Sequence, residues 1–286
     1  MMKPRLTQLS WEKERTRTVG AVLAAALLVG TGAACTSDGS SSEPSVDTSS
    51  GPSSAPESTG VVQASGSGEG ELPQGGEKAN LDPAEFTIEI DNPYWPMTPG
   101  NRWVYEEIDT DGTVQKVVVT VTDKTKMIAN GIEARVVRDV VSAEGELVEV
   151  TDDWYAQDAT GNIWYLGEET AEYENGKPVS TSGSFEAGVD GAEAGIAMPA
   201  NPQDGMAYRQ EYYKGEAEDR AEVLSLDEKA EVPFGYFKTT LMTKDLVPTE
   251  PKVSEHKFYA EGVGPVLTLD IAAGTGREEL LSYRSG

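Results

Sequence analysis

The stretch Asp153–Gly167, with the sequence DWYAQDATGNIWYLG, determines how the rest of this chain can be interpreted. It recurs in outline at Lys257–Leu269, which reads KFYAEGVGPVLTL. The Trp-Tyr-Ala triplet at 154–156 aligns with Phe-Tyr-Ala at 258–260 at an offset of 104 residues. Glycines placed ahead of both stretches align at nearly the same offset. We therefore predict that one β unit is used twice in tandem.

The fold class follows from short alternating segments separated by turn signals. Arg102–Ile108 and Val114–Thr122 flank an Asp-Thr-Asp-Gly turn at 109–112, and Asn130-Gly131 separates two further alternating segments. Both turns carry typical hairpin dipeptides. Glu216–Leu226 could form a short helix, but the repeat alignment favours a strand. The pattern predicts an all-β fold, an antiparallel meander that forms a sandwich or barrel-like sheet of two tandem repeats.

The predicted β-rich domain covers residues 82–286. Repeat 1 runs from about 92 to 167 and repeat 2 from about 205 to 284, with a connector at 168–204. The connector is rich in Gly, Ala and Pro and shows neither the strand nor the helix period. Long irregular connections in compact domains are often functional. We expect a segment without regular strands, either a lid or partner-facing segment or a simple crossover.

Residues 1–34 have the three-part organisation of a signal peptide. A polar, positively charged start precedes Val19–Val29, an apolar run of eleven residues that is too short to span a bilayer as a lasting helix. Gly32-Ala33-Ala34-Cys35 resembles the lipobox of bacterial lipoproteins. That resemblance implies cleavage between Ala34 and Cys35 and lipidation of Cys35. The alternative is a plain signal peptide with an incidental cysteine.

Residues 35–81 are predicted to be a disordered Ser/Gly/Pro linker that starts at the lipidated Cys35. Between Thr36 and Asn80, 27 of the 45 residues are Ser, Gly, Pro or Thr, and none is aromatic. Such a composition cannot bury enough apolar surface to fold. The linker would hold the β-rich domain away from the membrane.

The charge balance makes nucleic acid and anionic lipid headgroups poor partners. The chain has 23 Lys plus Arg and 49 Asp plus Glu. A surface this negative repels nucleic acid and anionic lipid headgroups, so the expected membrane contact is the lipid anchor alone. We interpret the acidic residues mainly as a solvated surface, with loosely held Ca²⁺ as the alternative.

Two acidic turns could in principle hold Ca²⁺: Asp109-Thr-Asp111-Gly112 and Asp158-Ala-Thr-Gly161-Asn162. Neither completes the twelve-residue EF-hand loop; counted from Asp109, the twelfth position is Thr120, where a bidentate Glu would be needed. Asp, Asn and Gly also form turns without any metal. Turn formation is therefore favoured, and no metal or cofactor is predicted.

No catalytic residue is predicted. His256 is the sole histidine, and no Gly-x-Ser-x-Gly elbow, Walker loop, dinucleotide fingerprint or His/Cys zinc spacing is present. Neighbouring acidic residues occur at 106/107, 152/153 and 168/169. Adjacent strand residues point to opposite faces, so such neighbours cannot both line one pocket. A non-enzymatic protein is favoured over a glycan hydrolase.

The candidate ligand-binding residues are aromatic and recur in both predicted repeats. They could stack on a glycan or surround a small apolar ligand, or they could be core residues shared by the two units. The residues are Trp103, Tyr105, Trp154, Tyr155, Trp164, Phe258 and Tyr259.

Two motifs resemble a family of secreted bacterial β proteins of unknown function, the TapB-like group. The opening motif is Asn92-Pro-Tyr94-Trp-Pro96, followed by Gly100 and Trp103-Val-Tyr105, and the closing motif is Tyr259-Ala-Glu-Gly262-Val-Gly264. The resemblance covers about Asn92–Leu269. It implies a β fold and an envelope setting, and it supplies no catalytic residues.

The sequence thus predicts a membrane-anchored surface lipoprotein that faces the extracytoplasmic side. Its expected role at the cell envelope is binding, carriage or scaffolding, and the alternative is an extracytoplasmic hydrolase that acts on glycans. The sequence does not identify protein partners.

Overall fold

The computed structural model describes residues 72–249, 251, 253–272 and 275–286. The predicted signal peptide, the Ala34–Cys35 cleavage site, lipidated Cys35 and most of the predicted linker lie outside the described residues. Within the described part, no helix is long and apolar enough to cross a membrane. The elements in order are η1 Pro83–Glu85, β1 Phe86–Thr87, β2 Arg102–Ile108, β3 Val114–Met127, β4 Glu133–Ala143, β5 Glu146–Asp158, β6 Ile163–Glu174, β7 Lys177–Ser180, β8 Phe185–Glu186, β9 Glu193–Met198, β10 Ala207–Arg209, β11 Glu211–Tyr212, β12 Arg220–Val232, β13 Gly235–Leu246, β14 Ser254–Ala260, β15 Gly264–Asp270 and β16 Arg277–Arg284.

The strands form where the sequence alternates and end where turn residues occur. In β3, buried and more exposed residues alternate from Val114 through Val121, as expected for a strand with one face on the core. The β2–β3 hairpin closes at Asp109–Gly112, where the Gly112 amide donates to the Asp109 carbonyl at 3.0 Å. Gly112 has a φ of 85°, which a side chain would disfavour. Both predicted hairpins are confirmed, and residues 220–226 are strand as predicted.

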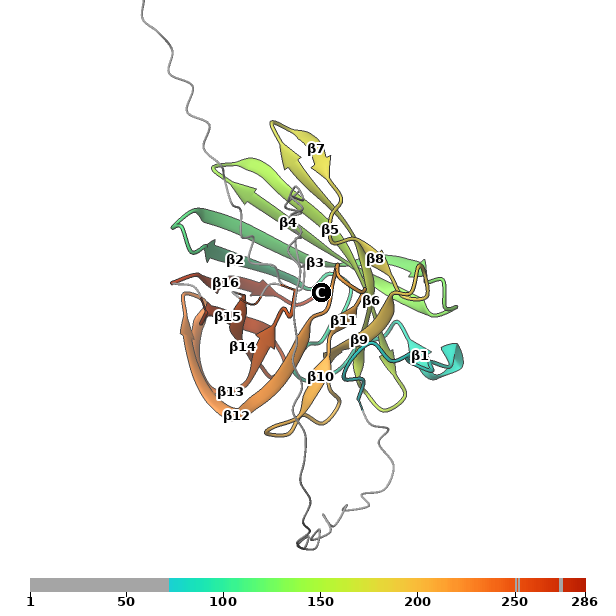
Figure 1. Cartoon of the computed structure of the whole chain (residues 1–286). Helices are drawn as coiled ribbons and strands as arrows, with labels where there is room; N and C mark the ends of the chain where they lie inside the picture. The colour runs from blue at the N-terminus through green and yellow to red at the C-terminus, as the bar shows by residue number, and fades with distance from the viewer. Residues whose placement is uncertain (1–71, 250, 252, 273–274) are drawn as a thin grey trace, which may run out of the picture. The chain divides into compact units, whose positions relative to one another are not determined.

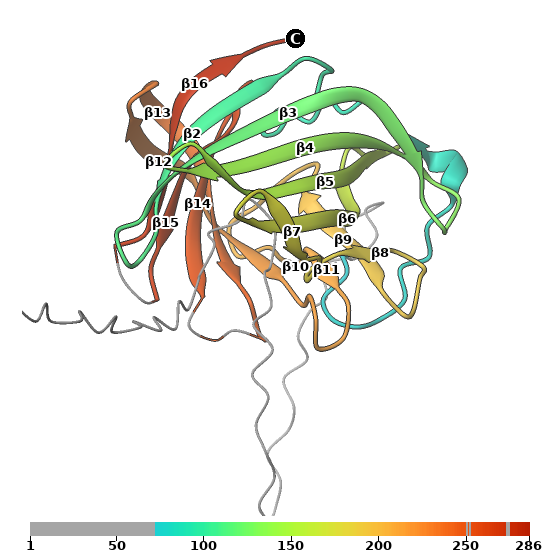
Figure 2. The ribbon, with the colours of Figure 1, turned by 90° about the horizontal axis from the view of Figure 1, so that it is seen from above.

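All strand pairs are antiparallel, and together they make one strongly curved sheet (Figures 1 and 2). The order is β10-β12-β13-β14-β15-β16-β2-β3-β4-β5-β6-β9-β11. The two ends of this order are consecutive in sequence, separated only by Gln210. The stretch Ala207–Tyr212, which we call the seam, therefore pairs with β12 through one half and with β9 through the other. The predicted barrel-like antiparallel sheet is confirmed.

An extended segment at the start of the described residues, Leu72–Ala79, lies along the seam; we call it the strap. Buried Arg209 of the seam donates to the carbonyl oxygens of Gly75 and Glu77, and its backbone amide donates to the Pro73 carbonyl. The Arg209 guanidinium also donates to the Ala194 carbonyl on β9 at 2.6 Å. One arginine thus joins the strap to both sides of the seam.

The expectation that residues 168–204 lack regular strands is wrong. β6 continues to Glu174, and β7, β8 and β9 all pair with β6. Ala194–Met198 is buried, so this apolar run of small residues is a sheet strand with both faces covered. Such strands have no alternation, which is why the period was missing from the sequence.

Aromatic side chains from distant parts of the chain meet in the core. The Trp95 ring lies 5.6 Å from the Tyr155 ring and 6.0 Å from the Tyr259 ring. Tyr155 on β5 and Tyr259 on β14 are the two tyrosines that the predicted repeat aligns. Duplication of one unit nevertheless stays a prediction, which superposition of the two halves would test.

Candidate functional site

The inner face of the sheet is defined by residues that alternate with solvent-facing neighbours. On β2, Trp103, Tyr105 and Glu107 point inward, whereas Glu106 is exposed. Residues that are directly paired on neighbouring antiparallel strands point to the same face of the sheet, so the inner face can be followed from β2 to β3 and β4. The inward positions thus include Val119 on β3 and Asp139 on β4, which pair with each other.

Carboxylates are unusually frequent among the buried residues. We call eight of them the interior acidic cluster, each at most 9% exposed: Glu107, Asp139, Glu149, Asp153, Glu168, Glu211, Asp219 and Glu278. Moving an ionised carboxylate away from water is costly, and like charges nearby increase the cost. The interior is therefore a place where protons or other cations are strongly favoured.

Three members of the cluster lie on adjacent strands. Glu168 on β6 is directly opposite Asp153 on β5, and Asp139 on β4 is opposite Thr151, two residues before Asp153. Direct cross-strand neighbours have Cβ atoms about 4.5–5.5 Å apart, and diagonal neighbours about 7–8 Å. Asp139, Asp153 and Glu168 therefore form one compact group, which we call the acidic triad.

Tyr165 links two members of the acidic triad. The Tyr165 hydroxyl oxygen lies 2.8 Å from Asp153 Oδ1 and 3.0 Å from Glu168 Oε2. A phenol has one hydrogen, so these two acceptors share the Tyr165 hydroxyl. Burial raises the pKa of both Asp153 and Glu168 well above their ordinary values. The charge of Asp139 raises the pKa of Asp153 further, and the charge of Asp153 raises that of Glu168.

Asp139 contributes an oxygen with no protein partner. Its Oδ1 is buried and has no hydrogen-bond partner in the protein, and the residue is 8% exposed. Burial, with a smaller contribution from the charge of Glu149, raises its pKa to about 8. Oε2 of Glu278 on β16 is also buried and has no hydrogen-bond partner in the protein. Burial raises the pKa of Glu278, and the charges of Glu107 and Asp139 raise it further.

The seam extends the cluster. Glu211 on β11 is 1% exposed, and its pKa is raised by burial and then by the charges of Asp219 and Glu168. Burial likewise raises the pKa of Asp219 to about 7, despite an opposing contribution from Lys257. The residues that close the sheet therefore carry acidic groups that face the triad.

A single buried ammonium group balances the second half of this interior. Lys257 Nζ lies 3.2 Å from Asp245 Oδ2 and 3.4 Å from Glu255 Oε2. Burial lowers the pKa of Lys257, but the two carboxylates outweigh burial and hold it well above its ordinary value. Because one lysine serves two carboxylates, burial still raises the pKa of Glu255.

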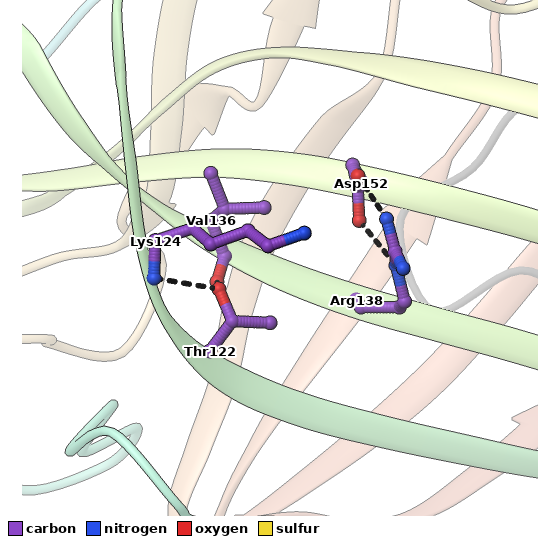
Figure 3. A network of polar contacts seen from close by, with 5 residues as sticks. All are labelled: Thr122, Lys124, Val136, Arg138 and Asp152. Atoms are coloured by element: carbon purple, nitrogen blue, oxygen red, sulfur yellow. Dashed lines mark hydrogen bonds and ion pairs between the residues drawn. The ribbon is translucent and has the colours of Figure 1, made fainter.

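The opposite face of the same strands is electrically compensated. Arg138 and Asp152 are direct cross-strand neighbours on β4 and β5, and the Arg138 Nε donates to Asp152 Oδ1 at 2.7 Å (Figure 3). Near them, the Thr122 hydroxyl donates to the Val136 carbonyl (Figure 3). Asp139 and Asp153 each follow one of these residues in sequence and point to the other face. On β4 and β5, the charges on the outer face are thus paired, whereas Asp139 and Asp153 on the inner face form no ion pair among the described residues.

The seven predicted aromatic residues are all buried but do not form one group. Trp103, Tyr105, Tyr155 and Tyr259 lie on the inner face, where the Tyr105 hydroxyl donates to the Pro265 carbonyl. Trp154, Trp164 and Phe258 occupy the alternate positions of β5, β6 and β14 and pack on the other face. Lys126 Nζ covers the Trp154 ring at 3.9 Å, and Phe86 meets the Trp164 ring edge-on. Their predicted ligand-binding role stays a prediction.

The two acidic turns use their carboxylates to fix the turn. Asp109 Oδ1 accepts from the amides of Asp111 and Thr113. Asp158 Oδ1 accepts from the Thr160 and Asn162 amides, and its Oδ2 accepts from the Trp164 indole at 2.8 Å. Among the described residues, no group of three or more His, Cys, Asp or Glu side chains is arranged to hold a metal ion.

The acidic residues inside the sheet were not predicted as a site, although a signal for them existed. Each neighbouring acidic pair places one member inside: Glu107, Asp153 and Glu168 are buried, and Glu106 and Glu169 are exposed. Alternation would have put Asp153 on the face of Tyr155, and Glu107 on the face of Tyr105. The interpretation of the acidic residues as a mainly solvated surface was therefore incomplete. His256 on β14 is partly exposed.

No protein-family model matches the chain, and no curated protein matches it in sequence. One solved structure with similarity to it is described as a candidate lipoprotein from Parabacteroides distasonis. The two are 13% identical with a TM-score of 0.35, and the similarity covers 67% of this chain and 98% of that chain.

Proposed function

We propose that this chain is an extracytoplasmic lipoprotein of the cell envelope whose β-rich head binds a small polar ligand and catalyses no reaction. The proposed location is supported by the apolar run Val19–Val29, which is followed by small residues and Cys35. Membership of the TapB-like group remains a prediction, and it would agree with a location at the cell envelope. A carrier or scaffold role would use the same head.

The observation that carries the binding role is the set of buried oxygens without protein partners. Asp139 Oδ1 and Glu278 Oε2 are both buried, and leaving such groups unpaired costs about 1–3 kcal/mol each, or more when charged. A fold that only needed stability would place apolar residues there. A ligand that brings hydrogen-bond donors would offset this cost.

The same observation changes the expected ligand. A small apolar ligand was one expectation from the aromatic residues, but the inner face that carries Tyr105 and Tyr155 also carries Asp139 and Asp153. An apolar molecule would leave Asp139 Oδ1 without a partner. We therefore propose a polar ligand with several donors in place of a purely apolar one.

The proposed location is tested by the substitution Cys35→Ala in the producing cell. We expect the variant to move from the membrane fraction to the medium, because its diacylglyceryl anchor can no longer form. A cell in which the variant stays in the membrane fraction to the same extent as the native chain would overturn the lipoprotein assignment.

The binding role is tested by native mass spectrometry of the full chain released from membranes in mild detergent. We expect a mass above that of the lipidated chain, which disappears after denaturation and dialysis. Absence of any adduct, together with no thermal stabilisation by any member of a small-molecule panel, would contradict a binding role.

Hydrolysis of glycans is the second candidate, and one observation favours it. Asp153 and Glu168 both accept from the Tyr165 hydroxyl, and two carboxyl groups placed in this way could act as a general acid and its partner. Both carboxylates are at most 3% exposed, which supports binding over attack on a polymer. Glycan cleavage that is lost in Glu168→Gln and kept in Glu169→Gln would establish hydrolysis instead.

A further inference from the structure

The two halves of the sheet hold a lysine and an aspartate at the same register position. Asp245 on β13 is opposite Glu255, and Lys257 follows two residues later on β14. Asp139 on β4 is opposite Thr151, and Asp153 follows two residues later on β5. The residues after Lys257 and Asp153 are Phe-Tyr-Ala and Trp-Tyr-Ala. Register alone therefore relates Asp139 to Asp245 and Asp153 to Lys257.

This relation places a carboxylate in one half where the other half has an ammonium group. In the second half, Lys257 reaches Asp245 and Glu255 and compensates both. In the first half, Asp139, Asp153 and Glu168 lie on three adjacent strands, and no described lysine or arginine forms an ion pair with them. The nearest inward cation by register is Arg135, opposite Tyr155, and its guanidinium donates to the carbonyl oxygens of Thr122 and Lys124. Arg135 forms no ion pair within the described part of the chain.

On this basis we propose that the acidic triad of Asp139, Asp153 and Glu168 is a binding site for the primary ammonium group of a small organic amine. The proposal rests on the binding role proposed above and names the ligand class. The ammonium would occupy the position that the Lys257 side chain fills in the second half. Asp139 Oδ1, the buried oxygen without a protein partner, is one acceptor that it would satisfy.

The carboxyl oxygens of the triad suit an ammonium group. The Tyr165 hydroxyl already lies between Asp153 Oδ1 and Glu168 Oε2, so an ammonium would approach the second oxygen of each carboxyl group. Asp139 Oδ1 would be a further acceptor. An ammonium has three donors and no acceptor, which matches three carboxylates.

The surroundings of the triad include apolar side chains that suit an alkyl amine. Tyr155 and Val137, which lie beside Asp153 on the inner face, are both buried and would contact an alkyl chain. The buried stem of Lys257 shows that this interior accepts four methylene groups with an ammonium at the end.

The experiment uses n-butylammonium, which reproduces the lysine side chain, and butan-1-ol as its neutral counterpart. Full-length protein is titrated at pH 7.5 and constant ionic strength by calorimetry, with thermal unfolding as a second readout and potassium chloride as a cation control. We expect saturable binding and a rise in Tm with n-butylammonium alone. Equal effects of butan-1-ol or potassium would overturn the ammonium assignment while leaving a binding role in place.

The decisive variant is Asp153→Lys, which supplies the missing ammonium from the chain itself. We expect it to unfold at a temperature at least equal to that of the ligand-free native chain and to lose affinity for n-butylammonium by at least about tenfold, because a charged partner has been replaced by a repelling one. Native-like affinity in this variant would overturn the proposal.

Two further variants keep the test decisive if Asp153→Lys does not fold. Asp139→Asn preserves shape and removes one acceptor charge, so its affinity for n-butylammonium should also fall by about tenfold. Asp152→Asn removes the neighbouring carboxylate on the outer face, which Figure 3 shows paired with Arg138, and should bind as the native chain does. Equal affinities in these two variants would place the amine elsewhere, and no binding of any probe or cellular adduct would remove the proposed function as well.

Discussion

Tyr165 and Asp153 are joined in the interior of the sheet, with the hydroxyl oxygen 2.8 Å from Oδ1 of the carboxyl group. Both side chains are at most 3% exposed. The same hydroxyl also donates to Glu168, and burial raises the pKa of both carboxyl groups, so protonation would relieve their mutual repulsion. The interior of this protein is therefore sensitive to the proton concentration outside it.

Stability of the head should fall as the pH rises from 5 to 8. Asp139 has a pKa of about 8 in the fold against an ordinary value of 3.8, and Glu149 one of about 7 against 4.5. Such groups bind protons more tightly when folded, so their contribution is fully present below pH 4 and is lost as the pH rises through the folded pKa. We expect Tm to fall by at least about 5 °C, since 1 kcal/mol is worth about 2–4 °C in a domain of this size.

Calorimetry across this pH range measures the effect, and the variants assign it. Asp139→Asn removes one proton-binding group from the interior, so its Tm should depend less steeply on pH. Asp152→Asn on the outer face should keep the native slope. The charge of Glu149 raises the pKa of Asp139, and the charge of Asp139 in turn raises the pKa of Asp153 and Glu278. A slope unchanged in Asp139→Asn would assign the effect to these other acidic residues.

Arg209→Ala should loosen the seam without unfolding the whole sheet. The substitution leaves the carbonyl oxygens of Gly75, Glu77 and Ala194 without their donor. Each loss costs about 1–3 kcal/mol where the group stays buried. We expect faster amide hydrogen exchange in Ala207–Tyr212 and β9 than in β3 and β4.

A matched control for Arg209→Ala is Arg138→Ala. Arg138 forms a part-exposed ion pair with Asp152, and such pairs contribute about 0–1 kcal/mol. Exchange in the seam should be unchanged in this control. Uniform acceleration over all strands in Arg209→Ala would mean that the seam has no separate opening step.

Gly195→Ala should prevent normal closure of the sheet. A Cβ atom at Gly195 on β9 would overlap the backbone carbonyl groups of Gln210 and Arg209. Backbone atoms in a paired strand cannot move aside as a flexible side chain can, so we expect a loss of several kcal/mol or failure to fold, measured by denaturant unfolding. Gly235→Ala is the control, because a Cβ there meets nothing within 4 Å and should change stability by about 0.5–1 kcal/mol at most.

The parts of the fold that were predictable from the sequence are those set by local chemistry. Asp109–Gly112 and Asn130-Gly131 specify hairpins because few other residues tolerate their backbone conformations. β9 was missed because Ala194–Met198 is covered on both faces and so has no alternation. Its place is decided by pairing with β6 and by the seam, which are contacts with distant parts of the chain.

The acidic triad was harder to foresee for a related reason. A carboxylate in an alternating strand usually marks the solvent face, and Glu106 and Asp152 follow that rule. Asp153 and Glu168 depart from it, and only the curvature of the sheet and the register of β4, β5 and β6 bring them to Asp139. The aromatic residues that were singled out instead are divided between the two faces by the same alternation.

The strap also determines where mechanical load would enter the head. Every residue N-terminal to Leu72 connects to the sheet through this segment, whose first fixed points are the Pro73 carbonyl on the Arg209 amide and the Gly75 carbonyl on the Arg209 guanidinium. If Cys35 is lipidated as proposed, tension on the linker would therefore act first on the stretch that closes the sheet, next to Glu211. Attachment to a surface and access to the acidic interior would in that case be governed by the same few hydrogen bonds.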